Sequence, residues 1–207
     1  MLRRLVADYA SLQVASEVIA AGGVVALPTE TLYGLAADPF RADAVARLFA
    51  VKGRSSERAL PLIAADLEQI ASHLGSLPPI GRCLAETFWP GPLTLLMRAP
   101  AALAEGVTGG TGRVGVRVPA HPVARDLCRA CQRPLTATSA NLSGEPPSSD
   151  PDEVERALGG RIDLLLDGGR APGGQPSTIV DVTGSTLQLV RAGALAWDEV
   201  QACVNRA

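Results

Sequence analysis

Aromatic residues make up only 3% of this 207-residue chain, and basic residues do not outnumber acidic ones. The 19 Lys and Arg residues face 21 Asp and Glu residues, which gives a net charge of −2 and a pI near 5.7. Proteins that hold nucleic acids rely on aromatic stacking platforms or on strongly basic faces. The composition therefore argues against a surface built mainly for nucleic acid and leaves room only for a local basic cleft.

Long apolar runs are also missing from the sequence. The opening segment, MLRRLVADYASLQVASEVIAAGG, carries the paired arginines of an export signal, but Asp8, Gln13 and Glu17 interrupt its apolar part. No other stretch approaches the roughly 18 consecutive apolar residues that a membrane-spanning helix needs. We therefore expect a soluble, cytoplasmic protein that does not contact a membrane.

Cysteine and histidine are too sparse for an evident disulfide framework or metal site. Only Cys128 and Cys131 have C-x-x-C spacing, and they fall within HPVARDLCRACQRP, a predicted helix. Helical residues three apart face the same way, so packing is the expected role of this pair. His73 and His121 are far apart in sequence, and we predict no metal site.

Lysine occurs once in the chain. Lys52 is one of the 19 basic residues and the other 18 are arginines. It lies in AVKGRSSERALPL with Arg54 and Arg58, near the end of a predicted helix. Cations stabilise that end of a helix, so this effect explains Arg58 as well as a ligand contact does. It does not explain Lys52, because any arginine could take the same role. A compact ammonium approaches one phosphate oxygen as a point charge, whereas a guanidinium prefers a planar grip on two oxygens. The pattern favours contact between Lys52 and a reacting phosphate.

Short β-like runs alternate with helical segments, and no linker or repeat divides the chain. Its length suits one core, so we expect a single domain over residues 1–207. Helices are expected from about residue 11 to 22 and over 42–50, 66–74, 79–88, 121–131, 151–158 and 197–205. Strands are expected over 24–28, 60–64, 93–97, 114–118, 135–138, 162–166, 177–182 and 187–191. Because the last strands follow one another without helices, the predicted fold is α/β with a mixed sheet.

Polar residues gather where the predicted strands end, the usual position of ligands in open α/β sheets. PTETLYG follows strand 24–28, and TSANLSG overlaps and follows strand 135–138. Arg117 lies between two valines in VGVRVP and points either to solvent or into a cleft, where its guanidinium would suit a carboxylate. GTGRVG (110–115) matches a dinucleotide fingerprint, but it leads into a strand instead of a helix, so we do not expect that kind of site.

Seven segments in this order resemble the YrdC/Sua5 family of threonylcarbamoyl-AMP synthases: PTETLYGLAAD, KGR, WPGPLTLL, VGVRVPAHP, TSANLSG, PSTIVD and LVRAG. The resemblance runs from about Gly22 to Gly193 and is to the short, single-domain bacterial form. It implies a YrdC-like twisted mixed sheet with flanking helices around a basic cavity. It also implies a nucleotidyltransferase that converts L-threonine, bicarbonate and ATP into threonylcarbamoyl-AMP and pyrophosphate, with Mg²⁺ on the pyrophosphate. A partner complex would then transfer the threonylcarbamoyl group to adenosine 37 of tRNA.

The resemblance further implies roles for individual residues. Threonine contacts are implied for Thr31, Arg117, Ala137 and Ser177. Contacts with ATP and its phosphates are implied for Lys52, Arg54, Arg58, Arg113, Ser139, Asn141 and Arg191. Lys52 and Arg54 are expected to be catalytic, because they would neutralise charge growing on the α-phosphate. Ile63 stands where longer members of the family have a threonine-contacting histidine.

We expect the threonine amine to add to bicarbonate or CO₂, after which a carbamate oxygen attacks the α-phosphate of ATP in line. No protein nucleophile is then required, but the short-lived carbamate needs a site that holds the amino acid in register. Two alternatives belong to other classes: an RNA-binding module, whose affinity would fall steeply with salt, and a carbamoyl-transfer domain related to hydrogenase maturation. A synthase of this family could also bind tRNA weakly and directly.

Overall fold

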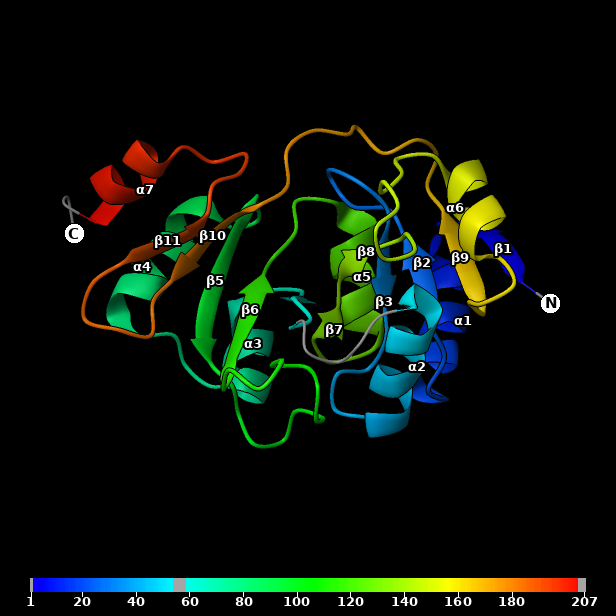
Figure 1. Ribbon diagram of the computed structural model, residues 1–207, viewed down its shortest axis with the longest axis horizontal. Helices are drawn as coiled ribbons and strands as arrows, with labels where there is room; N and C mark the ends of the chain where they lie inside the picture. Colours follow the sequence, from blue (N-terminus) through cyan, green and yellow to red (C-terminus); the bar gives the residue numbers. More distant parts are fainter. Residues whose placement is uncertain (1, 54–58, 205–207) are drawn as a thin grey trace.

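The computed structural model describes residues 2–53 and 59–204, and its strands form two sheets that both mix parallel and antiparallel pairs. The first sheet has the order β1 (Arg3–Val6), β9 (Leu164–Asp167), β2 (Val25–Leu27), β3 (Gly34–Ala36) and β8 (Thr138–Ser139). The second has the order β11 (Gln188–Arg191), β10 (Thr178–Asp181), β5 (Leu93–Arg98), β6 (Arg113–Arg117), β4 (Leu62–Ile63) and β7 (Leu135–Thr136). The sheets occupy opposite halves of the molecule, with β1 and α7 at its two ends (Figure 1).

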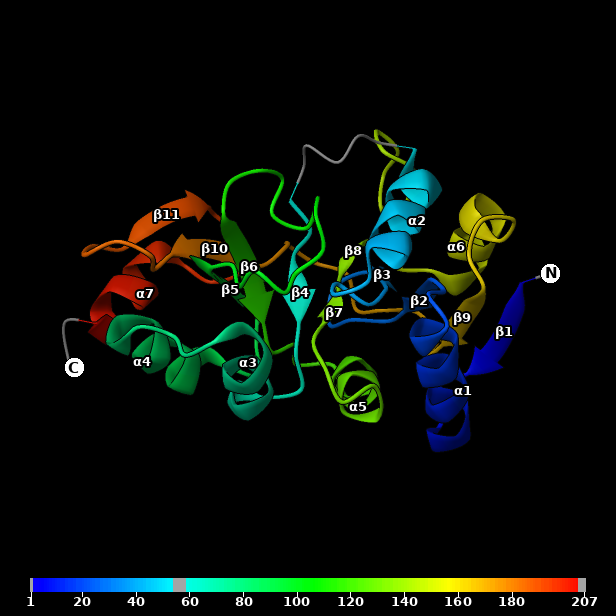
Figure 2. The ribbon, with the colours of Figure 1, turned by 90° about the horizontal axis from the view of Figure 1, so that it is seen from below.

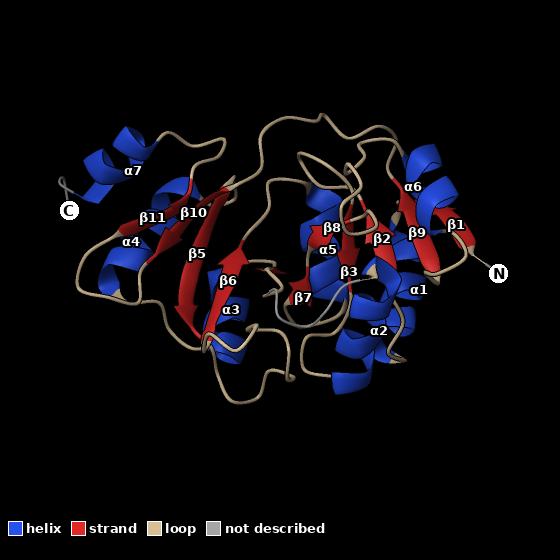
Figure 3. Cartoon of the chain, in the orientation of Figure 1, coloured by secondary structure: helices blue, strands red, loops and turns tan. Residues whose placement is uncertain are grey.

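The described residues form seven helices, which flank the two sheets (Figure 3). Their bounds are α1 (Tyr9–Ala20), α2 (Ala42–Lys52), α3 (Leu67–Leu74), α4 (Pro79–Phe88), α5 (Pro122–Ala130), α6 (Pro151–Leu158) and α7 (Trp197–Val204). In the first sheet, α2 and α6 pack with one face, and α1 and α5 with the other. In the second sheet, α4 and α7 share a hydrophobic cluster with β5 and β10. None of these helices is long and apolar enough to cross a lipid bilayer.

Strand β2 shows why the first sheet needs helices on both sides. Val24 and Ala26 join the cluster that contains α2 and α6, whereas Val25 and Leu27 join the cluster that contains α1 and α5. All four side chains have 0% exposure. Because alternate side chains of a strand point to opposite faces, a strand covered on both faces has a continuous apolar sequence. The run VVALP therefore specifies a central strand of a sheet that helices cover on both faces.

The predicted strand 135–138 is divided between the two sheets. Leu135 pairs with Ile63 in the second sheet, and Thr138 pairs with Leu35 in the first. At the crossing, the backbone of Thr136 donates to Ala37 O at 3.0 Å, and its hydroxyl accepts from Ala37 N at 2.8 Å. The α/β class is confirmed, but the expectation of one mixed sheet is corrected to two. The sequence TAT continues a β-like run across the break and does not reveal it.

Two further strands were missed by the sequence analysis. Strand β1 lies in the segment that has the paired arginines, and it pairs in parallel with β9. Arg4 of this strand donates to Asp152 at 2.6 Å and to Asp167 at 2.7 Å, so this arginine serves the fold. Strand β3 has only three residues within PTETLYGLAAD, too few for the alternation of side chains that identifies a strand. Apart from strand 135–138, the other predicted elements are found with ends shifted by up to two residues.

The tyrosine of PTETLYG anchors the connection between the sheets. Residues 168–177 lead from β9 to β10, along the upper side of the molecule in Figure 1. The Tyr33 hydroxyl donates to Gly169 O at 2.7 Å and accepts from Gly168 N at 3.2 Å. Tyr33 is 1% exposed, and burial raises its pKa to about 12, so the hydroxyl stays protonated as the donor. A buried side chain thus fixes where this connection begins.

We expect Tyr33→Phe to lower the free energy of unfolding by about 1–3 kcal/mol, because two backbone groups lose their partner. Urea denaturation followed by circular dichroism measures the change. Tyr9→Phe is the matched control, since Tyr9 is 78% exposed and should change stability by less than about 0.5 kcal/mol. Equal stability of the Tyr33 variant and the wild type would contradict the anchoring role.

Candidate functional site

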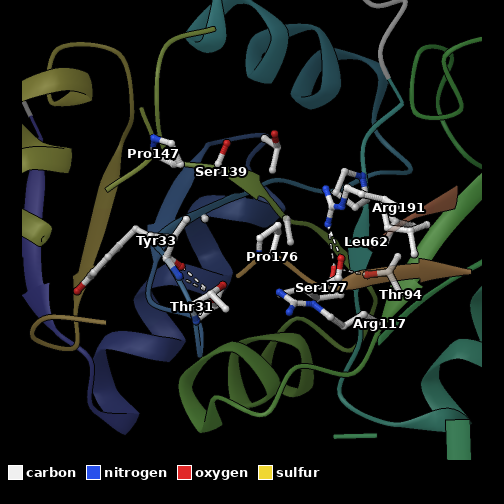
Figure 4. A pocket seen from close by; sticks show the side chains of 18 of the residues that line it. Thr31, Tyr33, Leu62, Thr94, Arg117, Ser139, Pro147, Pro176, Ser177 and Arg191 are labelled. Carbon is white, nitrogen blue, oxygen red and sulfur yellow. Dashed lines mark hydrogen bonds between the residues drawn. The ribbon is translucent and has the colours of Figure 1, made fainter. Parts of the chain in front are cut away.

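A cavity of about 560 Å³ lies where the two sheets meet (Figure 4). The first sheet and its loops contribute one wall, which includes Thr31, Tyr33 and Ser139. The second sheet contributes the facing wall, which includes Thr94 and Arg117. This volume lies within the range of roughly 300–1,000 Å³ found for small-molecule sites. The junction of the sheets is therefore the candidate ligand site.

Six of the residues with an implied contact to threonine or ATP line this cavity. They are Thr31, Arg117, Ala137, Ser139, Ser177 and Arg191. Lys52 and Asn141 lie directly behind Ser139 and contact it. Arg54 and Arg58 fall outside the residues that the structure describes. The fold thus gathers all four residues predicted to contact threonine and, next to them, part of the set predicted to contact ATP.

Sheet register explains why an arginine occurs within the apolar strand β6. Ile63 of β4 lies opposite Arg117, and Ile179 of β10 lies opposite Thr94 of β5. All four of these residues line the cavity. Their neighbours Leu95 and Val116 pair on the opposite, helix-covered face. Alternation along the strands therefore turns Arg117 into the cavity and excludes the solvent-facing interpretation of this residue.

The guanidinium of Arg117 is almost enclosed, with its side chain only 12% exposed. Burial lowers its pKa from the usual arginine value, Glu30 opposes that shift, and the positive charge of Arg191 adds to it. Nη1 of Arg117 donates to Oε1 of Glu30, whose side chain is 17% exposed. An enclosed arginine needs a compensating negative charge, and a carboxylate is its best geometric match. Within the part of the chain that the structure describes, Arg117 forms no other side-chain hydrogen bond, so its remaining N–H groups can meet a second anion.

A hydrogen-bonded chain links three polar residues on the same wall. The hydroxyls of Ser177 and Thr94 are 2.8 Å apart. Nη2 of Arg191 donates to Ser177 O at 2.6 Å and lies 3.3 Å from its hydroxyl. A Cβ on Gly193 would lie 2.3 Å from Pro176 O, so only glycine allows this close approach of the two segments. The hydroxyls and Arg191 are thereby held at one edge of the cavity (Figure 4).

Thr31 is held in the opposite wall by a tight turn. The hydroxyl of Thr29 accepts from the backbone N–H groups of Thr31 at 3.2 Å and Leu32 at 3.3 Å, and it donates to Leu32 O at 2.7 Å. Threonine hydroxyls commonly form such turns with nearby backbone groups. Gly173 N also donates to Thr31 O at 2.8 Å, which ties the turn to the connection between the sheets. The segment PTETLYG is thus a rigid part of the wall.

Lys52, at the end of α2, anchors the loop that follows β8. Its residue is 2% exposed, and Nζ lies 2.5 Å from Ser139 O and 3.0 Å from both Asn141 O and Asn141 Oδ1. Gly53, with φ of 62°, ends the helix in the left-handed region, so the chain turns away directly after the lysine. Three oxygen atoms around one nitrogen suit an ammonium and not a planar guanidinium. These contacts account for a lysine at this position and occupy its three N–H donors, so the phosphate contact expected from the sequence stays a prediction.

Arg113 lies at the other end of β6, about 13 Å from Arg117 at the usual rise of a strand. It is absent from the cavity wall and donates to Asp181 Oδ2 at 2.6 Å.

Cys128 is buried in the cluster with α1, and Cys131 packs against that cluster. Burial raises the pKa of both thiols. The expected packing role of this pair is confirmed.

Sequence reasoning missed two residues of the site. Thr94 is the one polar residue in LTLLM, and its position between Leu93 and Leu95 indicates that it faces away from the helices. Glu30 lies within PTETLYG, but the sequence motifs implied no ligand contact for it. An acidic residue in a segment that is otherwise mostly buried was the available signal, because such a carboxylate needs a cation.

Comparisons with known proteins point to one protein family. The family model for Sua5, YciO and YrdC, described as telomere recombination, matches residues 17–193. The threonylcarbamoyl-AMP synthase of Pyrococcus abyssi (strain GE5 / Orsay) is 37% identical over 194 residues, which cover 94% of this chain and 57% of that protein. The threonylcarbamoyl-AMP synthase of Coxiella burnetii (strain RSA 493 / Nine Mile phase I) is 39% identical over 186 residues, which cover 88% of this chain and 99% of that protein.

A crystal structure of P. abyssi Sua5 complexed with L-threonine matches with a TM-score of 0.90 and 35% identity, covering 98% of this chain and 60% of that one. The chain thus spans little more than half the length of the P. abyssi protein. The matched family is the one that the seven sequence segments predicted. The chain belongs to the Sua5/YciO/YrdC family.

Proposed function

We propose that this protein is a threonylcarbamoyl-AMP synthase, which forms threonylcarbamoyl-AMP and pyrophosphate from L-threonine, bicarbonate and ATP. The observation that carries this proposal is the position of Arg117, an enclosed arginine in a small-molecule cavity beside the loop held by Lys52. The family relatives that bear this name, and the P. abyssi relative that binds L-threonine, support it.

The amino acid would occupy the part of the cavity between Arg117 and Thr31. A carboxylate on the guanidinium makes a charge-assisted contact, and hydroxyl groups from Thr31, Thr94 and Ser177 surround the same space. Ile63 presents an apolar side chain next to Arg117. A small amino acid that carries both a methyl and a hydroxyl group fits this mixture of surfaces, as L-threonine does.

The nucleotide would lie against the loop after β8, next to the amino acid. Ser139 lines the cavity there, and Lys52 and Asn141 stand behind it. Arg191, at the edge of the second sheet, supplies another positive charge to the same cavity. In this arrangement the carbamate formed on the amino acid reaches the α-phosphate directly. The protein then contributes by positioning both reactants and by stabilising charge.

The described lining of the cavity contains no Asp or Glu side chain, so it does not form a Mg²⁺ cage. Protein-bound Mg²⁺ is commonly held in part by substrate phosphates, and Mg²⁺ would arrive here with the triphosphate of ATP. As further parts of the proposal, residues 1–207 act as one domain, the reaction takes place in the cytoplasm, and a separate transferase complex passes the product to tRNA.

Pyrophosphate release from ATP should require both L-threonine and bicarbonate. The measurement is an enzyme-coupled pyrophosphate assay with each substrate omitted in turn. Release without either substrate would contradict the proposed reaction. Release that depends on carbamoyl phosphate would favour a carbamoyl-transfer domain instead, and salt-sensitive RNA binding without pyrophosphate release would favour an RNA-binding module.

Lys52→Ala should lower kcat about 100-fold, because Ser139 and Asn141 lose the ammonium that holds them in the wall proposed for the nucleotide. Lys52→Arg should lose most of the rate as well, because a guanidinium does not fit among the three oxygen atoms. Arg47→Lys is the matched control: it lies on the same helix, pairs with Asp163 at 2.6 Å and is exposed. A native rate for Lys52→Arg would contradict the special role of lysine.

Arg117→Ala should raise the KM for L-threonine roughly 10- to 100-fold, because a charge-assisted contact of about 1.5–3 kcal/mol is lost. The KM for ATP should change far less. Steady-state kinetics with each substrate varied in turn separate the two effects. Arg98→Ala, an exposed arginine on β5, serves as control. An unchanged KM for threonine would remove Arg117 from the threonine site.

A further inference from the structure

We propose that Glu30 binds the α-ammonium group of the amino acid, so that the cavity selects α-amino acids by their charged head group. The inference rests on the proposed function, because it assigns a recognition residue to the same site. Glu30 lies between Thr29 and Thr31, which both line the cavity, and its carboxylate pairs with Arg117. Its carboxylate therefore lies directly behind the wall that meets the amino acid and is joined to that wall through Arg117.

The carboxylate of Glu30 is only half satisfied. Oε1 accepts from Arg117, whereas Oε2 is buried and has no hydrogen-bond partner within the part of the chain that the structure describes. Leaving a buried charged acceptor unpaired is costly, so such atoms call for an explanation. A ligand that brings a cationic donor would satisfy it. The terminal torsion of a glutamate side chain is soft, so either oxygen can turn toward the ligand.

The neighbouring groups do not supply that cation. His121 Nδ1 is also buried and has no partner among residues 2–53 and 59–204, and burial lowers the pKa of His121, with Glu30 opposing the shift. A neutral imidazole leaves the carboxylate as the charged acceptor. Arg191 influences Arg117 through its charge, but its Nη2 donates to Ser177. Among the described residues, Glu30 thus keeps one oxygen without a partner, beside the arginine with which it is paired.

A paired arginine and glutamate are complementary to a zwitterion. An α-amino acid carries its carboxylate and its ammonium on one carbon, only a few ångströms apart. Laid against the pair, the ligand carboxylate meets the remaining N–H groups of Arg117 and the ammonium meets Glu30. An analogue with a hydroxyl in place of the amine keeps the first contact and loses the charged second one. Hydrogen bonds to charged groups are the stronger ones, so the wall distinguishes the two ligands.

The test is calorimetric titration, without ATP, of L-threonine and of its analogue in which a hydroxyl replaces the α-amine. We expect the wild type to bind threonine roughly 10- to 100-fold more tightly than the analogue. Glu30→Gln should weaken threonine binding by a similar factor and change analogue binding less than about threefold, because it removes the charge and keeps the side chain's size. Glu68→Gln, an exposed glutamate on α3, should bind both ligands as the wild type does.

Equal weakening of both ligands in Glu30→Gln would mean that Glu30 only orients Arg117, and it would overturn the proposal. Unchanged threonine binding would overturn it as well. If the Gln variant fails to fold, the wild type alone decides, since equal affinity for the two ligands contradicts ammonium recognition. Failure of the proposed function has a different signature, because the wild type would then release no threonine-dependent pyrophosphate.

Discussion

The structure depends on one crossing, at which the chain leaves the second sheet and enters the first within three residues. Thr136 is fully buried, and its backbone and hydroxyl both bond to Ala37. Ala137, the residue between the two strands, lines the cavity, and its N–H donates to Pro61 O at 2.8 Å. Strands from both sheets are thereby tied at one point, and the space beside that point becomes the ligand site. The hydrophobic cluster that contains residues of both sheets keeps the two in contact.

Charge in this site is distributed so that each buried group has a defined neighbour. Lys52 is surrounded by oxygen atoms of the loop after β8, and Arg117 is paired with Glu30. The first contact shapes the wall at which we place the nucleotide, and the second shapes the wall at which we place the amino acid. Buried cations without such neighbours would be unstable. The same contacts therefore serve the fold and prepare the surfaces that the proposed reactants would meet.

Local signals in the sequence predicted the elements, and ordered motifs predicted the family, but neither could predict the assembly. The apolar run of β2 and the capped helices follow directly from side-chain periodicity. The break at Ala137 depends on partners from distant segments, so a continuous β-like run concealed it. The single lysine drew attention to Lys52, but its contacts with backbone oxygens depend on the position of a loop nearly 90 residues further along the chain. The acidic residue in PTETLYG indicates that Glu30 needs a cation, but neither segment indicates that this cation is Arg117.

The cavity wall combines the turn at Thr31 with Ser177 and Arg191 from the last strands of the chain. In Figure 2, β10 and β11 lie in the half of the molecule opposite to β2, which precedes that turn. A nascent polypeptide therefore lacks part of this wall until its final strands have left the ribosome. Contacts between such distant segments raise the contact order, which slows folding. Ligand binding thus becomes a property of the finished chain, and a ligand that binds only the native state stabilises the last contacts to form.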